Sequence, residues 1–259
     1  MTGGLTLGDT PRKKAIVISH ERSGTHFLMN TLALNFGYIS KPWINFDFEI
    51  GINFHSSREL LAFFKKMHDL PILNIIKSHH HISFFSDFID YLAEQFHIFY
   101  IYRDPRDVMV SFWRLIQNLS WDEGPKTDSV CQFMRTAPRG AILRYQKEQS
   151  PTILHRWQDH VIGWINFAEE SRNQKAIVIR YEDLNLKFDE IVKEIGIRID
   201  FSAEKPKRPD REDNVILPGT GQVSDYRKFF TQEDRDFILN TVGETMNRLC
   251  INLLQDRQA

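Results

Sequence analysis

The stretch from Ala15 to His26 reads AIVISHERSGTH, and it predicts the fold. It opens with five mostly apolar residues, the pattern of a strand that is buried on both faces of a parallel sheet. A polar segment with one glycine follows. Helical composition then continues to Phe36 and ends before Gly37, a residue typical of the position just past a helix. We therefore expect a strand, a short turn and a helix, in this order.

Further apolar runs of the same kind occupy residues 72–76, 97–102 and 176–179. The segments between them carry apolar residues at helical spacing. These are Val108, Phe112 and Leu115, preceded by Asp104 as N-cap and Pro105 at the first helical position; Trp157, Val161, Trp164, Ile165 and Ala168; Phe188, Ile191, Val192 and Ile195; and Ile238, Val242, Leu249 and Leu253. Strands that alternate with helices predict an α/β fold, a parallel sheet flanked by helices.

Composition narrows the class of protein. Among 259 residues, 33 Lys and Arg nearly balance 34 Asp and Glu, which argues against a partner found through overall charge, such as nucleic acid or a membrane surface. Cys131 and Cys250 are too few and too far apart for a disulfide framework or a metal site of their own. We expect one domain over residues 14–255, after a flexible lead-in at 1–13. Neither a secretory signal nor a membrane span is predicted, and a cytoplasmic location is favoured.

Two regions break the alternation of strands and helices. Residues 38–58 are aromatic and rich in turn residues, and residues 118–151 are polar and contain three prolines. Loops this long in a compact domain are usually functional lids or mobile segments, and both regions are expected to be one or the other.

The turn after the first strand predicts an anion site. Backbone N–H groups at a helix N-terminus and the helix dipole both favour negative charge, and Arg22 adds a cation with a forked geometry. The turn lacks the lysine of a Walker A loop. An alternative without a ligand is a helix capped by Ser23 or Thr25, with Gly24 allowing a tight turn.

A second cluster begins where the third strand ends. Arg103 is expected at the carboxyl edge of the sheet, where ligands bind in open α/β folds. Ser111 lies in the next helix and must point toward Arg103 to share its ligand. Alternatively, Arg103 forms an ion pair with Asp104 or Asp107, and the hydroxyl of Ser111 bonds the helix backbone.

Taken together, these motifs resemble the sulfotransferases that use 3′-phosphoadenosine 5′-phosphosulfate (PAPS), from about residue 14 to 235. That family carries a 5′-phosphosulfate loop similar to residues 19–27, and an Arg with Ser eight positions later, as in Arg103 and Ser111. Its K-T-H and Y-E-D motifs are matched by residues 77–79 and 181–184, and its W-x-x-H-x-x-x-W run by residues 157–164. The resemblance implies a single α/β domain related to P-loop kinases.

The chain also departs from the family pattern. Arg22 replaces the loop lysine, as in related branches, and Phe27 replaces the adenine-stacking tryptophan. The C-terminal R-K-G-x-x-G-D-W-K box is reduced to Gly221 and Asp225. Backbone N–H groups around Gly221, or alternatively Arg208 and Arg211, are candidates to replace the two lost basic residues. The dimer motif becomes Arg227, Thr231, Gln232 and Asp236, so we expect a monomer or a weak homodimer.

The resemblance also implies roles in catalysis. Sulfuryl transfer, like phosphoryl transfer, needs a base for the acceptor and cations for the leaving oxygen. His79 is the expected general base. Lys77 and Arg22 are expected to stabilise negative charge. No metal is expected: His79, His80 and His81 are adjacent, point in different directions and have no evident partner ligand.

The nucleotide is expected to be bound by residues from several motifs, with PAP as the product. Ser23, Gly24, Thr25 and His26 are assigned to the 5′-phosphate, Arg103 and Ser111 to the 3′-phosphate, Phe27 and Tyr181 to the adenine, and Gly221 to the remaining 3′-phosphate contacts. A structural alternative for Tyr181 is that it anchors the end of the fourth strand.

The acceptor is expected between the two long loops. Trp43, Phe46, Phe48, Trp113 and Trp121 are candidates to line an apolar pocket, although plain core packing is the simpler interpretation for each. Asp47, Glu49, Asp122, Glu123 and Asp128 favour a small and cationic acceptor over an anionic glycan. Two other functions stay open: a P-loop-type kinase of nucleotides or small molecules, and a nucleotide-binding module without catalysis.

Overall fold

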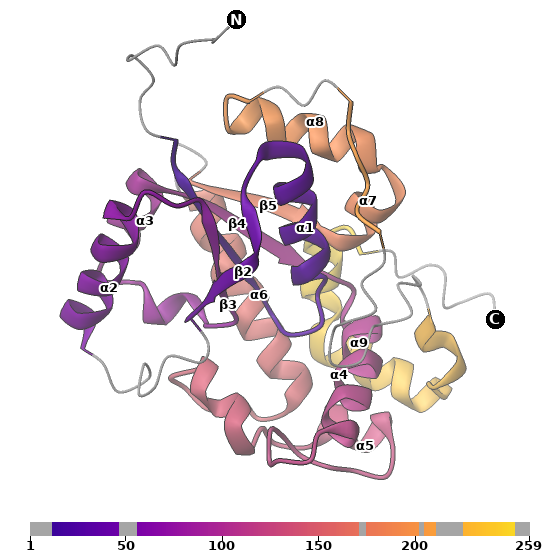
Figure 1. The fold of residues 1–259 in the computed structure, drawn as a ribbon. Helices are drawn as coiled ribbons and strands as arrows, with labels where there is room; N and C mark the ends of the chain where they lie inside the picture. Colours follow the sequence, from indigo (N-terminus) through magenta and orange to yellow (C-terminus); the bar gives the residue numbers. More distant parts are fainter. Residues whose placement is uncertain (1–11, 47–55, 171–174, 202–204, 211–224, 252–259) are drawn as a thin grey trace, which may run out of the picture.

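A five-stranded parallel sheet forms the centre of the molecule (Figure 1). The computed structural model describes residues 12–46, 56–170, 175–201, 205–210 and 225–251. The strands are β1 (Lys14–Ser19), β2 (Ile39–Asn45), β3 (Asn74–Ser78), β4 (Phe96–Tyr102) and β5 (Ala176–Arg180). Their order across the sheet is β2-β3-β1-β4-β5, and every neighbouring pair is parallel. This confirms the predicted α/β class.

Helices cover both faces of the sheet (Figure 1). They are α1 (Thr25–Phe36), α2 (Ser57–Asp69), α3 (Ile89–Gln95), α4 (Pro105–Asn118), α5 (Val130–Arg135), α6 (Ile153–Glu170), α7 (Tyr181–Leu186), α8 (Phe188–Arg198) and α9 (Gln232–Arg248), with 3-10 turns η3 (Ile82–Phe84), η4 (Gly140–Tyr145) and η5 (Asp225–Lys228). Among the residues described, no helix is both long and apolar enough to cross a membrane.

Alternate residues of the strands build two separate cores. In β1, Ala15 and Val17 face a core made with α1, α7 and α8, whereas Ile16 and Ile18 face a larger core made with α2, α3, α4, α6 and α9. Successive side chains of a strand point to opposite faces, so a strand between two helical layers must be apolar throughout. This explains why the apolar runs in the sequence show no alternation.

Most of the predicted elements are confirmed. The helix over residues 25–36 has Gly37 in the left-handed conformation at its end, and α4 has Asp104 as N-cap, accepting a hydrogen bond from the N–H of Arg106. The strand predicted at 72–76 lies two residues further on, at 74–78. The lead-in predicted at 1–13 falls almost entirely outside the described residues, as does Leu253.

Treating residues 38–58 as one loop was wrong, because residues 39–45 form β2. The strand lies at the edge of the sheet, and its register with β3 shifts between Ile39 and Ile44. Pro42, which lacks a donor for the ladder, is tolerated at such an edge irregularity. Because this edge strand is partly exposed, it contains polar residues and a proline, and its composition resembles that of a loop.

The second long region, residues 118–151, also has more structure than predicted. It contains α5, whose N-cap Ser129 accepts a hydrogen bond from the N–H of Gln132, and the 3-10 turn η4. Val130, Phe133 and Ile142 from this region are buried in the larger core. Its prolines separate short helical turns that are packed against the domain.

The strand order explains where a ligand site can form. β1 lies between β3 and β4, so the segments that follow these three parallel strands emerge side by side at one edge of the sheet. These segments contain residues 20–26, His79 and Arg103 respectively. Ligands of open α/β sheets bind at this carboxyl edge.

Candidate active site

Residues 20–26, the phosphate loop, join β1 to α1 through two left-handed residues. Arg22 has φ 66° and Gly24 has φ 98°. Gly24 is the N-cap of α1, and no side chain caps this helix. The alternative interpretation, a helix capped by Ser23 or Thr25, is therefore wrong. No side chain caps the amides at the start of α1, and the helix dipole there favours an anion.

Gly24 is required for close packing as well as for its backbone conformation. A Cβ at this position would lie 2.4 Å from Cδ2 of Tyr181. The hydroxyl of Ser23 is buried in the same turn and has no hydrogen-bond partner. A buried orphan hydroxyl beside uncapped helix amides fits an anionic group.

The phosphate loop and the Arg103 cluster meet at one place. Nε–H of Arg22 donates to Oγ of Ser111, at 2.9 Å. Burial and, to a smaller extent, the nearby charge of Arg103 together lower the pKa of Arg22 to about 10. Two arginines close enough to repel one another fit a shared anionic ligand.

Arg103 is held by packing and by charge. Its Cζ lies 4.6 Å from the ring centroid of Tyr181, and its Nη2 lies 3.5 Å from Oδ2 of Asp107. The ion pair between Arg103 and Asp107, given above as an alternative, is therefore present, and Arg103 also lies beside the phosphate loop. Tyr181 contacts both the phosphate loop and Arg103, so the same ring packs against both predicted phosphate sites.

Glu182 was not predicted as a site residue. Its Oε1 accepts from the backbone N–H of Asp104, next to Arg103, and its Oε2 accepts from Nε–H of Arg180. Burial raises the pKa of the carboxyl group. The Y-E-D motif therefore connects the end of β5 to the turn after β4, and an acidic residue directly after an apolar strand was the signal in the sequence.

The two residues predicted to flank the adenine, Phe27 and Tyr181, lie next to each other. Their ring centroids are 6.1 Å apart, and Cζ of Arg208 lies 5.3 Å from the Phe27 centroid. His26 makes an edge contact with Trp43, with centroids 5.0 Å apart. The surface beside Gly24 is therefore aromatic with a cation over it, which suits the face of a base.

The predicted base and its neighbouring lysine lie at the end of β3. Lys77 and His79 are both buried. Nδ1–H of His79 donates to the carbonyl of Ser19 at 2.8 Å, so the neutral ring carries its lone pair on Nε2. The ring of His79 also makes an edge contact with Tyr145. A histidine held in this tautomer can accept a proton at Nε2.

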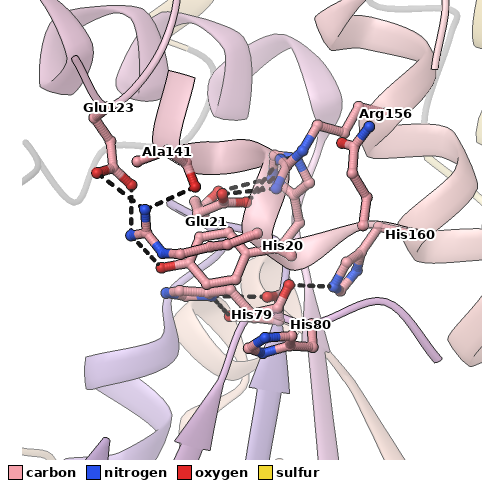
Figure 2. A network of polar contacts seen from close by, with 12 residues as sticks. His20, Glu21, His79, His80, Glu123, Ala141, Arg156 and His160 are labelled. Carbon is pink, nitrogen blue, oxygen red and sulfur yellow. Dashed lines mark hydrogen bonds and ion pairs between the residues drawn. The ribbon is translucent and has the colours of Figure 1, made fainter. Parts of the chain in front are cut away.

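Sequence reasoning missed a buried polar network beneath the phosphate loop, shown in Figure 2. Nη1 and Nη2 of Arg156, on α6, donate to the two carboxylate oxygens of Glu21, both at 2.8 Å. Nη1 also donates to Nε2 of His20 at 2.7 Å, and Nδ1–H of His20 donates to the carbonyl of Glu21. Removing one partner of such a buried pair costs about 3–5 kcal/mol.

The pKa values of this network follow from burial and from Arg156. Burial lowers the pKa of His20 to about 4, which keeps the ring neutral at pH 7. Burial by itself would raise the pKa of Glu21, but the Arg156 guanidinium holds it well below its usual range. Arg156, His160 and Trp164 are spaced four residues apart on the buried face of α6. Of these three, only Trp164 belonged to the predicted apolar stripe, and the overlooked signal was an arginine in register with it.

The residues predicted to line an acceptor pocket differ in how deeply they are buried. Phe46 is fully buried in the larger core, as the packing alternative expects, while Trp43 and Trp113 are half-buried. Trp121 is exposed and donates from Nε1 to Glu123. Glu123 is paired with Arg144 at 2.7 Å, so its charge is largely offset. Asp122 and Asp128 are exposed.

Several predicted residues fall outside the described part of the chain, namely Gly221, Arg211, Asp47, Phe48 and Glu49. Within the described part, no group of three or more His, Cys, Asp or Glu residues is arranged to hold a metal ion.

Comparison with known proteins adds to this geometry. The family model described as "Sulfotransferase domain" matches residues 12–216. Human sulfotransferase 2A1 is 26% identical over 179 residues, which is 65% of this chain. The match spans 53% of the human protein, about half of its length.

Solved structures share the fold at low sequence identity. Mouse sulfotransferase SULT7A1, complexed with PAP, superposes with a TM-score of 0.62 at 17% identity, covering 92% of this chain and 85% of that one. A retinol dehydratase in complex with retinol and PAP gives 0.58 at 16% identity, covering 91% and 82%. A sulfotransferase from Alicyclobacillus acidocaldarius gives 0.55 at 14% identity, covering 96% and 100%. These likenesses establish the fold, as expected.

Replacing Gly24 should damage both stability and the anion site. Gly24→Ala places a methyl group against Tyr181 in a left-handed turn, and we expect it to lower the free energy of unfolding by more than about 1 kcal/mol. Gly243→Ala is the matched control, because its Cβ would meet the Leu239 side chain at 3.9 Å in the middle of α9. Alanine there should be neutral or stabilising. Urea unfolding of both variants checks this, and equal stabilities would contradict it.

Acid should destabilise the fold through His20. Between pH 6.5 and about 4 the unfolded chain binds a proton at this residue and the folded chain does not, so stability falls as the pH falls. From pH 7 to pH 5 the loss from this residue should be about 2 kcal/mol. His20→Gln keeps an acceptor for Arg156 and should lose less stability over this range. Urea unfolding at both pH values measures the difference, and identical losses would refute the assignment.

Proposed function

Because the chain belongs to the sulfotransferase domain family, we propose that it transfers a sulfuryl group from PAPS to a hydroxyl or amine of a small molecule. One observation carries this proposal. The phosphate loop and the Arg103 cluster, predicted separately from sequence, meet through the Arg22–Ser111 hydrogen bond and the Tyr181 ring. A nucleotide with phosphates at both ends of its ribose would occupy both sites.

The residues around Gly24 and Arg103 would hold the donor nucleotide. The α1 amides, with Ser23, Thr25 and His26, would bind the 5′-phosphate, since the Ser23 hydroxyl is a buried donor that lacks a partner. Arg103 and Ser111 would bind the 3′-phosphate, and Phe27 and Tyr181 would flank the adenine. When bound, PAPS supplies the sulfuryl group, and PAP is the expected product. Backbone N–H groups around Gly221 would complete the nucleotide site.

His79 would act as the general base. Its Nδ1–H is held by the Ser19 carbonyl, and Nε2 would take the proton from the acceptor hydroxyl or amine. Lys77 on β3 and Arg22 in the phosphate loop would stabilise the negative charge that develops on the donor side. No step requires a metal ion, because these cations belong to the chain.

We expect a small acceptor molecule, a cytoplasmic location and action as a monomer or weak homodimer. The retinol dehydratase structure is a complex with retinol and PAP, which supports a small-molecule acceptor here. The pairing of Glu123 with Arg144 leaves Asp122 and Asp128, together with Asp47 and Glu49, as the basis for expecting a cationic acceptor.

Nucleotide selectivity separates this proposal from a P-loop kinase. In a thermal-shift assay without Mg²⁺, PAP should stabilise the protein, and ATP and ADP should do so far less, because they lack the 3′-phosphate. At 100 times its dissociation constant, PAP should add about 2.7 kcal/mol of stability. Equal or larger stabilisation by ATP, with turnover that depends on Mg²⁺, would favour the kinase.

The role of His79 separates a catalyst from a nucleotide-binding module. His79→Ala should lower sulfuryl transfer from PAPS by about 10²–10⁴-fold and leave PAP affinity within about twofold. His81→Ala, two residues along, is the control and should keep its turnover within about threefold. Unchanged turnover in His79→Ala would remove this residue from the mechanism. Binding of PAP with no transfer in the wild type would indicate a module.

Arg208 is proposed to replace one basic residue of the degenerate C-terminal box. Its guanidinium lies over Phe27 and Phe188 and donates to the carbonyl of Asn185. Arg208→Ala should weaken PAP binding about tenfold, or about 1.4 kcal/mol, in isothermal titration calorimetry. Lys193→Ala, an exposed cation on α8, should leave binding unchanged. Equal affinities in the two variants would exclude Arg208.

A further inference from the structure

Helix α6 makes polar contacts with both halves of the site. Arg156 binds Glu21 and His20 at the start of the phosphate loop. Four residues later, Nε2–H of His160 donates to the carbonyl of His79, at 3.2 Å. After another four residues, Nε1–H of Trp164 donates to the carbonyl of His80. Residues four apart lie on one face of a helix, so a single rigid face contacts the phosphate loop and the end of β3.

The phosphate loop needs an external support. Arg22 has φ 66°, a backbone conformation that an arginine rarely adopts without being held there. On one side, the loop continues into Gly24 and α1. On the other side is Glu21, whose carboxylate accepts two hydrogen bonds from Arg156. The residue directly before the strained one is therefore fixed by a buried, forked ion pair (Figure 2).

The contact between Arg156 and His20 further restricts the conformation of the phosphate loop. His20 accepts from Arg156 at Nε2 and donates from Nδ1 to the carbonyl of Glu21, so its ring bridges the guanidinium and the backbone at residue 21. Edge contacts with Phe112 and His160, at 5.6 and 5.7 Å between centroids, hold the ring in place. Side chain and backbone of Glu21 are thus both restrained from α6.

We propose that Arg156 is a positioning residue, which acts through Glu21 and His20 to hold the phosphate loop in its nucleotide-binding conformation and in register with His79. Arg156 and Glu21 are 3% and 6% exposed, so water cannot replace their hydrogen bonds. Arg156 has no role in contacting the reacting atoms. The inference rests on the proposed function for its choice of ligand, but the support of the loop itself can be measured without any ligand.

The test compares Arg156→Met with Arg135→Met. Arg135 forms an ion pair of 2.6 Å with Asp234 between α5 and α9, so its loss removes a partly buried arginine–carboxylate contact that does not involve the phosphate loop. For both variants and the wild type, PAP affinity is measured by isothermal titration calorimetry, and hydrogen exchange of the amides of residues 21–25 is measured without ligand. Arg156→Lys keeps the charge but loses the fork.

Arg156→Met should raise the dissociation constant for PAP at least tenfold and speed exchange in residues 21–25 at least tenfold, with exchange in β4 unchanged. Arg156→Lys should lie between this variant and the wild type. Arg135→Met should leave both quantities within twofold, even where its stability falls. If Arg156→Met has wild-type loop exchange and PAP affinity, the proposal is overturned.

Two further outcomes are also decisive. If Arg156→Met does not fold, Glu21→Gln takes its place, since it keeps the size of the side chain and removes one acceptor of the fork. The same tenfold changes are then expected. If the wild-type protein does not bind PAP, the proposed function fails. Loop exchange still decides the role of Arg156, because faster exchange supports it and unchanged exchange refutes it.

Discussion

The position of β1 between β3 and β4 is the constraint on which the site depends. The three strands run parallel, so the phosphate loop, His79 and Arg103 must follow them at the same edge. Arg22 and Arg103 come close enough there for the charge of Arg103 to lower the pKa of Arg22. Two adjacent cations without a shared anion repel one another, and a ligand with two anionic groups relieves that repulsion.

Two buried histidines beneath this edge stay neutral at pH 7. His20 and His160 both have pKa values lowered by burial, and each nitrogen of each ring has a hydrogen-bond partner. The Arg156–Glu21 pair, which contacts His20, is charged and joined by two hydrogen bonds of 2.8 Å. Removing any member of this network is expected to lower the free energy of unfolding. The intact network restrains the phosphate loop to one conformation.

The sequence predicted the central strands and the helices around them, because burial on two faces makes strands uniformly apolar and amphipathic helices periodic. It also placed the phosphate loop and Arg103 after two parallel strands, whose carboxyl ends share one edge of the sheet. The strand order that makes these segments neighbours comes from the structure. Edge strand β2 was missed because Pro42 and an irregular register hide it. The pairing of Glu21 with Arg156 could not be predicted: the spacing of Arg156 on α6 indicates burial, but its partner depends on how α6 packs across the fold.

The most direct measurement of the central claim is the affinity of the wild-type protein for PAP relative to AMP, by isothermal titration calorimetry under identical salt conditions. The two ligands share the adenine, the ribose and the 5′-phosphate. Because the 3′-phosphate binds beside Arg103, PAP should bind at least 100-fold more tightly than AMP, a difference of about 2.7 kcal/mol. Equal affinities would mean that the two clusters do not form one nucleotide site.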